Sequence, residues 1–152
     1  MEKYAYSKWY VIITLCIPFS INASVHYRVD TVAGLAGDPG IADSSTASSA
    51  RFFRPSDIAI DGSDTIFIVD SGNNIIRKMT ALGAVSTIAG RAGTKGGVDG
   101  DASVSLFRRP FGTVVAADGT VYVVDSGNHA IRKITPSGIV STFAGQIGAK
   151  GS

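Results

Sequence analysis

Cysteine, histidine and an excess of one charge are scarce or missing in this 152-residue chain. The only cysteine, Cys16, lies in an apolar stretch near the N-terminus, so the rest of the chain can form neither a disulfide nor a thiolate metal site. The two histidines, His26 and His129, are too few for a zinc site built on imidazoles. The 14 basic residues nearly balance the 12 acidic ones, which removes the long-range attraction expected of a protein that binds nucleic acid or anionic membranes.

Patterns that would indicate catalysis or a cofactor are also incomplete. Asp125, Ser126 and His129 crowd into one turn, with no group nearby to form an oxyanion hole. The DGD sequence at 99–101 lacks the later acidic residue that the EF-hand pattern requires. The stretch GRAGTKGG at 90–97 is like a phosphate loop, but no serine or threonine follows its lysine. The sequence therefore predicts no enzyme, no metal site and no cofactor.

The first 23 residues have the layout of a secretory signal peptide. Lys3 and Lys8 precede an almost wholly apolar run at 9–21, and Ala23 offers a small residue for cleavage. The run is shorter than the about 20 residues that span a bilayer. We therefore expect residues 1–23 to be removed and the protein to be secreted. The alternative is a membrane anchor formed by residues 9–21.

What the chain does contain is a repeat. VDSGNNIIRK at 69–78 returns as VDSGNHAIRK at 124–133, 55 positions later. Around these phrases residues 52–90 align with residues 107–145, and VDTVAG at 29–34 matches the last residues of both units. The chain therefore contains the end of one unit followed by two whole units.

Each unit has the pattern of four short strands rather than of helices. The β-rich runs are 57–61, 65–69, 75–80 and 85–89 in the first unit, and 113–117, 120–124, 130–135 and 140–144 in the second. The second run of each unit, with IFIV or VYVV, is apolar on both faces, so both faces should be covered. Four-stranded antiparallel sheets that cover one another are the blades of a β-propeller. A β-sandwich of two sheets is the alternative, but it would leave one face of each such run in water.

These residues resemble the NHL repeat, whose name comes from an Asn-His-Leu signature. Asn128 and His129 match its first two letters, while Ala130 departs from the third; in the first unit only Asn73 matches. The resemblance implies an all-β fold of NHL-type propeller blades, six in a typical member.

The expected domain covers residues 24–152, with four-stranded blades at about 54–90 and 109–145. Two blades cannot close a ring, and their outer faces and edge strands would be exposed. We therefore expect either that the chain is part of a longer propeller or that several copies assemble to complete a ring.

The repeated turn is expected to be structural. The residues assigned to this role are Asp70, Gly72, Arg77, Asp125, Gly127 and Arg132. The two glycines are expected to supply a positive φ, and the two aspartates to accept turn N–H groups. Each arginine points away from the isoleucine before it, and we expect it to pair with the aspartate of its own turn.

The turns between the second and third strands should emerge on the same side as the linkers between units, because the strands alternate in direction. The linkers at 35–53 and 91–109 are long, as functional loops often are. This loop-rich face is therefore the candidate binding surface. Its candidate binding residues are Asn73, Asn74, Asn128, His129, Lys95, Asp99 and Asp101.

Two functions from different classes fit these observations. One is an extracellular scaffold that binds protein, peptide or glycan partners through the loop-rich face. The other is a secreted hydrolase or lyase whose catalytic residues lie on further blades. Nothing in the residues favours catalysis, so we expect binding, with no nucleic acid partner and no membrane contact beyond the signal peptide.

Overall fold

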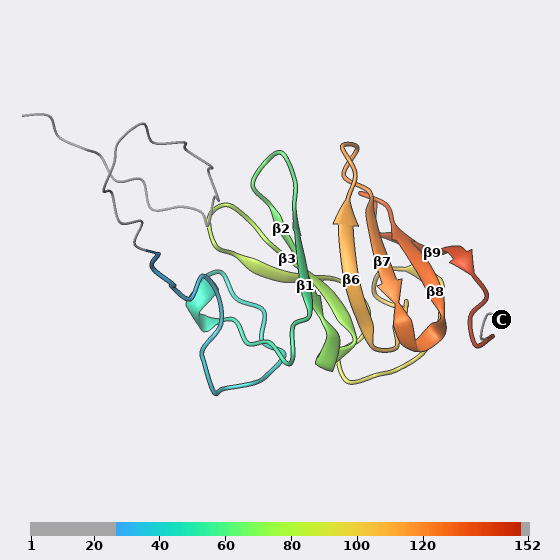
Figure 1. The fold of residues 1–152 in the computed structure, drawn as a ribbon, viewed down its shortest axis with the longest axis horizontal. Coiled ribbons are helices and arrows are strands. Elements are labelled where there is room, and N and C mark those ends of the chain that lie inside the picture. The colour runs from blue at the N-terminus through green and yellow to red at the C-terminus, as the bar shows by residue number, and fades with distance from the viewer. Residues whose placement is uncertain (1–26, 150–152) are drawn as a thin grey trace, which may run out of the picture.

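The computed structural model describes residues 27–149, which form two antiparallel sheets joined by a long linker (Figure 1). The elements are η1 (Ala47–Ser49), β1 (Asp57–Ile60), β2 (Ile66–Asp70), η2 (Ser71–Asn73), β3 (Ile75–Met79), β4 (Val85–Ala89), β5 (Gly100–Asp101), β6 (Pro110–Val115), β7 (Val121–Asp125), η3 (Ser126–Asn128), β8 (Ala130–Ile134) and β9 (Ile139–Gly145). The first sheet has the order β1-β2-β3-β4, and we call it blade 1. The second has the order β5-β9-β8-β7-β6, and we call it blade 2.

Each blade is a simple up-and-down sheet. In blade 1 Ile68 on β2 lies opposite Ile58 on β1 and Arg77 on β3, and the same pairing recurs in blade 2. The prediction of four antiparallel strands in each unit is confirmed. The fifth strand of blade 2, β5, was not predicted, because its two residues in the linker are too short to show a period.

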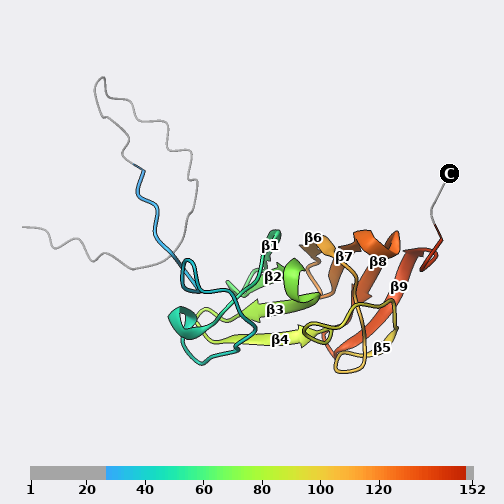
Figure 2. The same ribbon diagram turned by 90° about the horizontal axis from the view of Figure 1, so that it is seen from below.

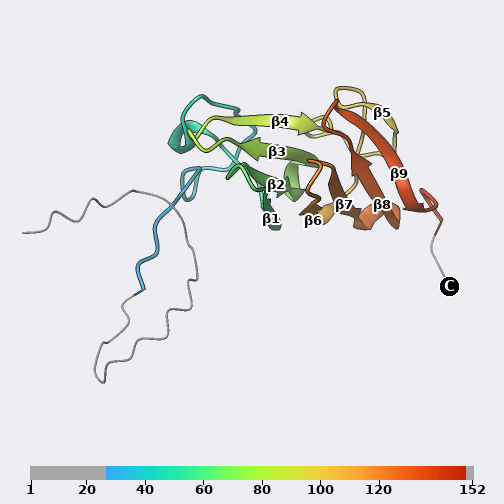
Figure 3. The same ribbon diagram turned by 90° about the horizontal axis from the view of Figure 1, so that it is seen from above.

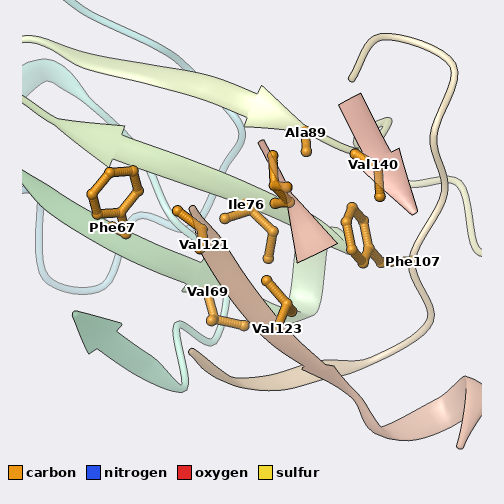
Figure 4. Close-up of a cluster of buried hydrophobic side chains, with 9 residues drawn as sticks. Phe67, Val69, Ile76, Ala89, Phe107, Val121, Val123 and Val140 are labelled. Atoms are coloured by element: carbon orange, nitrogen blue, oxygen red, sulfur yellow. The ribbon is translucent and has the colours of Figure 1, made fainter. Parts of the chain in front are cut away.

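The main hydrophobic core lies between the two blades (Figure 4). Its buried members are Phe67, Val69, Ile76, Ala89, Phe107, Val121, Val123, Ile134 and Val140. Where the blades meet, β1 and β6 lie side by side, while β4 and β5 lie on the opposite side (Figures 2 and 3). Ser56 donates its hydroxyl to the carbonyl of Phe111 at 2.7 Å, and Asp57 accepts the N–H of Thr113 at 2.7 Å. One face of blade 1 therefore packs on one face of blade 2, and we call this contact the seam.

Within residues 27–149, nothing covers the other face of blade 2. Val114, Val124 and Phe143 on this face are 62%, 41% and 60% exposed. Val69, which aligns with Val124, is fully buried because blade 2 covers it. The expectation that the second strand is covered on both faces therefore holds for β2, but it is wrong for β7 among the described residues.

The other face of blade 1 is partly covered by the segment that precedes it. Ile68, Met79 and Val85 pack there with Ala50 and the half-buried Phe52. The side chains of β1 on this face remain about half exposed. The VDTVAG segment at 29–34 forms no strand, although it matches the sequence of the fourth strand of each unit.

The expected signal peptide, residues 1–23, lies outside the described residues. Among residues 27–149 no helix is long and apolar enough to cross a membrane.

Candidate binding face

Beneath the loop-rich face, each blade holds a fully buried arginine. In blade 2, Arg132 donates through Nη1 to Asp125 Oδ2 at 3.0 Å and to the carbonyl of Leu106 at 2.9 Å. Through Nη2 it donates to Asp99 Oδ1 at 2.6 Å and to the carbonyl of Val98 at 2.8 Å. One guanidinium thus ties the linker to the turn between β7 and β8. We call this arrangement the arginine clasp.

Blade 1 repeats the arginine clasp. Arg77 Nη1 lies 3.3 Å from Asp70 Oδ2 and also donates to the carbonyl of Arg51. Arg77 Nη2 donates to Asp43 Oδ1 at 2.7 Å and to the carbonyl of Ala42 at 2.6 Å. The pairing of Asp70 with Arg77 that the sequence suggested is therefore present in the structure, and Asp125 and Arg132 lie in the same relation.

The arginines also stack on aromatic rings. The Arg77 guanidinium carbon lies 4.5 Å from the centroid of the Phe52 ring, and that of Arg132 lies 5.0 Å from the Phe107 ring. A guanidinium is weakly hydrated and planar, so it can be buried in this way with less cost than an ammonium group.

The aspartates of the repeated phrase join three segments of each blade. Asp70 accepts the backbone N–H of Phe53 at 2.9 Å and the side-chain amide of Asn73 at 2.8 Å, in addition to Arg77. Burial raises the pKa of Asp70, and the hydrogen bonds from Asn73, Phe53 and Arg77 oppose that rise. The repeated phrase predicts N–H donors from the turn itself, but the backbone donor comes from the segment before β1.

Asp99, the linker carboxylate of the blade 2 arginine clasp, is also engaged within the fold, because it accepts hydrogen bonds from Arg132 and Thr142. Partial burial acts to raise its pKa, but donors from Thr142 and Arg132 outweigh burial and hold the pKa of Asp99 below its usual value. Its counterpart Asp43 was missed in the sequence. Each linker does carry an aspartate before its phenylalanine, but the spacing differs by one residue. Asp43 precedes Phe52 by nine positions, and Asp99 precedes Phe107 by eight.

The glycines of the turn serve a different purpose from the one predicted. Gly72 and Gly127 do not have a positive φ; the left-handed residues are Asn74, with φ 58°, and His129, with φ 57°. The glycines are needed because a Cβ at Gly72 would collide with the carbonyl oxygen of Phe53. That oxygen accepts the Gly72 N–H at 2.8 Å, so neither group can move aside.

Gly72→Ala is accordingly expected to destabilise the chain by about 1–3 kcal/mol, the usual cost of forcing an extra methyl group into a packed site. Gly62→Ala is the matched control, because a Cβ at Gly62 meets nothing within 4 Å and its φ is not positive. Urea unfolding of the two variants, followed by far-ultraviolet circular dichroism, measures the difference. Equal stability of the two would contradict the steric account.

Three of the four asparagine and histidine candidates are buried. Asn73 and Asn128 donate to the aspartate of their own turn and to the carbonyls of Gly40 and Gly96. Asn74 accepts the N–H of Arg109 across the seam at 2.9 Å. Their amides therefore hold the fold together and are not presented to a ligand.

The remaining candidates are exposed, but they do not all share one face. His129 is exposed because no blade packs against blade 2 at the position where blade 2 covers Asn74. Lys95 is exposed in the linker on the loop-rich face. Asp101 pairs with Ile139 at the start of β9, so it lies at the opposite end of the blade from the turn at 126–129. The placement of Asp101 on the binding face was therefore wrong, because β5 carries the linker away from it.

A cleft opens where the seam reaches the loop-rich face. It has a volume of about 610 Å³ and lies between the residues before β1, the η2 turn, the linker and the start of β6. Its lining residues are Phe53, Arg54, Pro55, Ser56, Ser71, Gly72, Asn74, Lys95, Arg109 and Phe111. Two of these, Asn74 and Lys95, are among the binding residues predicted from the sequence. Arg54 and Arg109 were missed, since each stands before a proline in a loop and only the packing of the blades brings the two loops together.

A second cavity, of about 420 Å³, lies at the other end of the seam. Phe67, Val121 and Ile134 form its apolar part, while Asp61 and Lys78 contribute the charged groups. Within residues 27–149 no group of three or more histidine, cysteine, aspartate or glutamate side chains is placed to hold a metal ion.

The two similar sheets, and the equivalent segments of the two units that line the cleft, define a repeat protein built from propeller-type blades. Residues 107–134 match the family model of the NHL repeat. The chain thus carries an NHL repeat, and its resemblance to NHL-repeat β-propeller proteins is confirmed.

Solved structures show the same architecture. A protein of unknown function from Bacteroides thetaiotaomicron is 32% identical over 57% of this chain and 22% of its own, with a TM-score of 0.52. An auxiliary nutrient binding protein from the same organism is 28% identical over 58% of this chain and 25% of its own, with a TM-score of 0.53. An auxiliary nutrient binding protein from Bacteroides ovatus, 20% identical over 66% of this chain and 28% of its own, has a TM-score of 0.56 and supports the fold alone. The matched part of this chain thus corresponds to about a quarter of each of these proteins. A search of curated proteins finds no significant match.

Proposed function

We propose that this protein is a secreted NHL-repeat scaffold that binds extracellular protein, peptide or glycan partners through the loop-rich face. The observation that carries the proposal is the cleft at the seam. Its volume of about 610 Å³ is in the range of ligand sites, and it combines exposed aromatic rings with a few polar side chains. Secretion is supported by the apolar N-terminal sequence at 9–21.

The burial of the acidic residues and their pairing with arginines favour binding over catalysis. Asp70 and Asp125 are buried beneath the face and held by Arg77 and Arg132, and no carboxylate lines the cleft. Hydrolases and lyases most often use a histidine or a carboxylate as general acid or base, and among residues 27–149 none lines the cleft. The similarity to a nutrient binding protein at 28% identity also supports a binding role.

The uncovered face of blade 2 is a separate surface. Its exposed Val114, Val124 and Phe143 are equivalent to Ala59, Val69 and Ile88, the blade 1 residues that pack against blade 2. Assembly of several copies to complete a ring stays a prediction that this surface supports.

The proposed function is tested by blocking the cleft. In a Cys16→Ser background, Lys95→Cys places a single thiol at the cleft and Ser137→Cys places one in the exposed turn at the other end of blade 2. Both variants are coupled to a bulky polyethylene glycol maleimide and applied to arrays of defined glycans and peptides. We expect the unmodified chain to bind a subset of the array, the label at position 95 to abolish that binding, and the label at 137 to leave it intact. Equal loss from both labels, or no binding by the unmodified chain, would refute the proposal.

A further inference from the structure

Among residues 27–149, the cleft at the seam is lined by three cations and by no carboxylate. Arg54, Lys95 and Arg109 all line it, and all three are exposed. In the part of the chain that the structure describes, none of their side chains forms an ion pair or a hydrogen bond. Three like charges around one cleft repel one another unless an anion lies among them.

The carboxylates closest to the cleft in sequence are already engaged. Asp57, two residues after Pro55, accepts the N–H of Thr113 across the seam. Asp70, just before the η2 turn, is fully buried and held by Arg77. Neither carboxylate lines the cleft, so the residues that line it carry a net positive charge.

The two arginines are held in place by the fold. Arg54 and Arg109 occupy equivalent positions in the two units, each directly before a proline, and both have left-handed backbones with φ of 53° and 50°. A left-handed backbone is unfavourable for a residue with a side chain, and a residue before a proline normally prefers an extended backbone. The Arg109 N–H donates to Asn74 at 2.9 Å, which fixes the Arg109 backbone against blade 1. Side chains projecting from a fixed backbone lose less freedom when a ligand binds.

Two aromatic rings border the cations. Phe53 is 42% exposed and Phe111 is 65% exposed, and both line the cleft. Their solvent exposure leaves apolar surface for the body of a ligand, next to donors for its charged group. The Ser56 to Phe111 hydrogen bond joins the segment before β1, which carries Phe53, to the start of β6, which carries Phe111.

We propose that this cleft binds a small organic anion. A carboxylate, sulfate or phosphate group would accept hydrogen bonds from Arg54, Arg109 and Lys95, and the ring or chain bearing it would pack against Phe53 and Phe111. This inference rests on the proposed function, since it names the class of ligand that the loop-rich face takes.

The test is a titration of the ¹⁵N-labelled chain followed by amide chemical shifts. The probes are benzoate, phenyl sulfate and phenyl phosphate, which share one ring and differ in the anion, with benzyl alcohol as the neutral probe. We expect at least one anion to bind about tenfold more tightly than benzyl alcohol, with an affinity that falls as salt is added. The order of the three affinities shows whether the cleft prefers a carboxylate, a sulfate or a phosphate group.

A pair of charge-matched variants separates a site from general attraction. Arg54→Gln/Arg109→Gln removes two cations of the cleft, while Arg91→Gln/Arg108→Gln removes two exposed cations that do not line it. The first variant should weaken anion binding about tenfold or more, and the second should leave it within about twofold of the unchanged chain. Thermal unfolding of both checks that they fold.

Equal weakening by both variants, or equal affinity for benzyl alcohol and the anions, overturns the anion site. If the array experiment shows that the label at position 95 blocks binding of neutral ligands, the proposed function stands and only the anion inference fails. If neither the probes nor the arrays bind at the cleft, both fail.

Discussion

Replacing Arg132 by methionine is expected to destabilise the chain by about 3–5 kcal/mol, the cost of removing one partner from a buried ion pair. The substitution leaves the buried Asp125 with only its bonds from Arg108 N–H and Asn128. It also removes the side-chain donor of the Leu106 carbonyl and one of the two donors of the Val98 carbonyl, which still accepts the Leu106 N–H. A small domain is stable by about 5–15 kcal/mol in total, so much of the free energy of unfolding would be lost. Urea unfolding followed by circular dichroism measures the loss.

A double-mutant cycle identifies the cause. Asp125→Leu combined with Arg132→Met removes both buried charges, and the two substitutions together should cost clearly less than the sum of the two alone. Arg91→Met is the matched control, because Arg91 is exposed; its effect should be within about 0.5 kcal/mol. Additive effects of the two clasp substitutions would mean that the ion pair contributes nothing beyond packing.

The strands could be predicted because their signal is local. Most runs of alternating β-rich residues, bounded by Gly, Asp or Asn, form strands close to the predicted limits, as β2 (Ile66–Asp70) and β3 (Ile75–Met79) show. The exception is β6 (Pro110–Val115), which begins three residues before the predicted run at 113–117. The partnership of Asp70 with Arg77 was also accessible, since the two lie across one turn and the pair recurs in the second unit. In both cases the relevant residues are close together in the sequence.

The remaining features depend on contacts between units and could not be derived from one unit. The third member of each clasp, Asp43 or Asp99, comes from a linker more than 30 positions before the arginine. The cleft exists only because β1 and β6 pack side by side, and this brings Arg54 close to a position 55 residues later. The burial of Asn74 and the exposure of His129 follow from the same cause, since one has a blade over it and the other has none.

The glycine error illustrates a different limit. A Gly in a turn between strands suggests a positive φ, and this predicts such a conformation for Gly72. The structure assigns the left-handed conformation to Asn74, a residue type that also tolerates it, and leaves Gly72 to allow the close approach of Phe53. Sequence shows that a turn needs both residues, but only the geometry shows which role each one has.

Phe107→Ala should be the most damaging apolar substitution, because Phe107 is fully buried at the seam and stacks under Arg132. Truncation of a buried phenylalanine costs about 3–5 kcal/mol, and here it also removes the ring on which the clasp rests.

The chain supplies its own control in Phe52, which holds the same position in the first unit and stacks on Arg77. Phe52 is only half-buried, because no blade lies beyond it, so Phe52→Ala should cost less than Phe107→Ala by at least about 1 kcal/mol. Both variants are compared by urea unfolding at the same protein concentration. If the two substitutions lower the free energy of unfolding equally, packing between the blades adds nothing to the burial that a linker provides alone. The blades would then be held together by their covalent connection and not by their packed faces. The predicted inequality follows because only Phe107 lies between two blades, so removing it opens a cavity that neither sheet can fill.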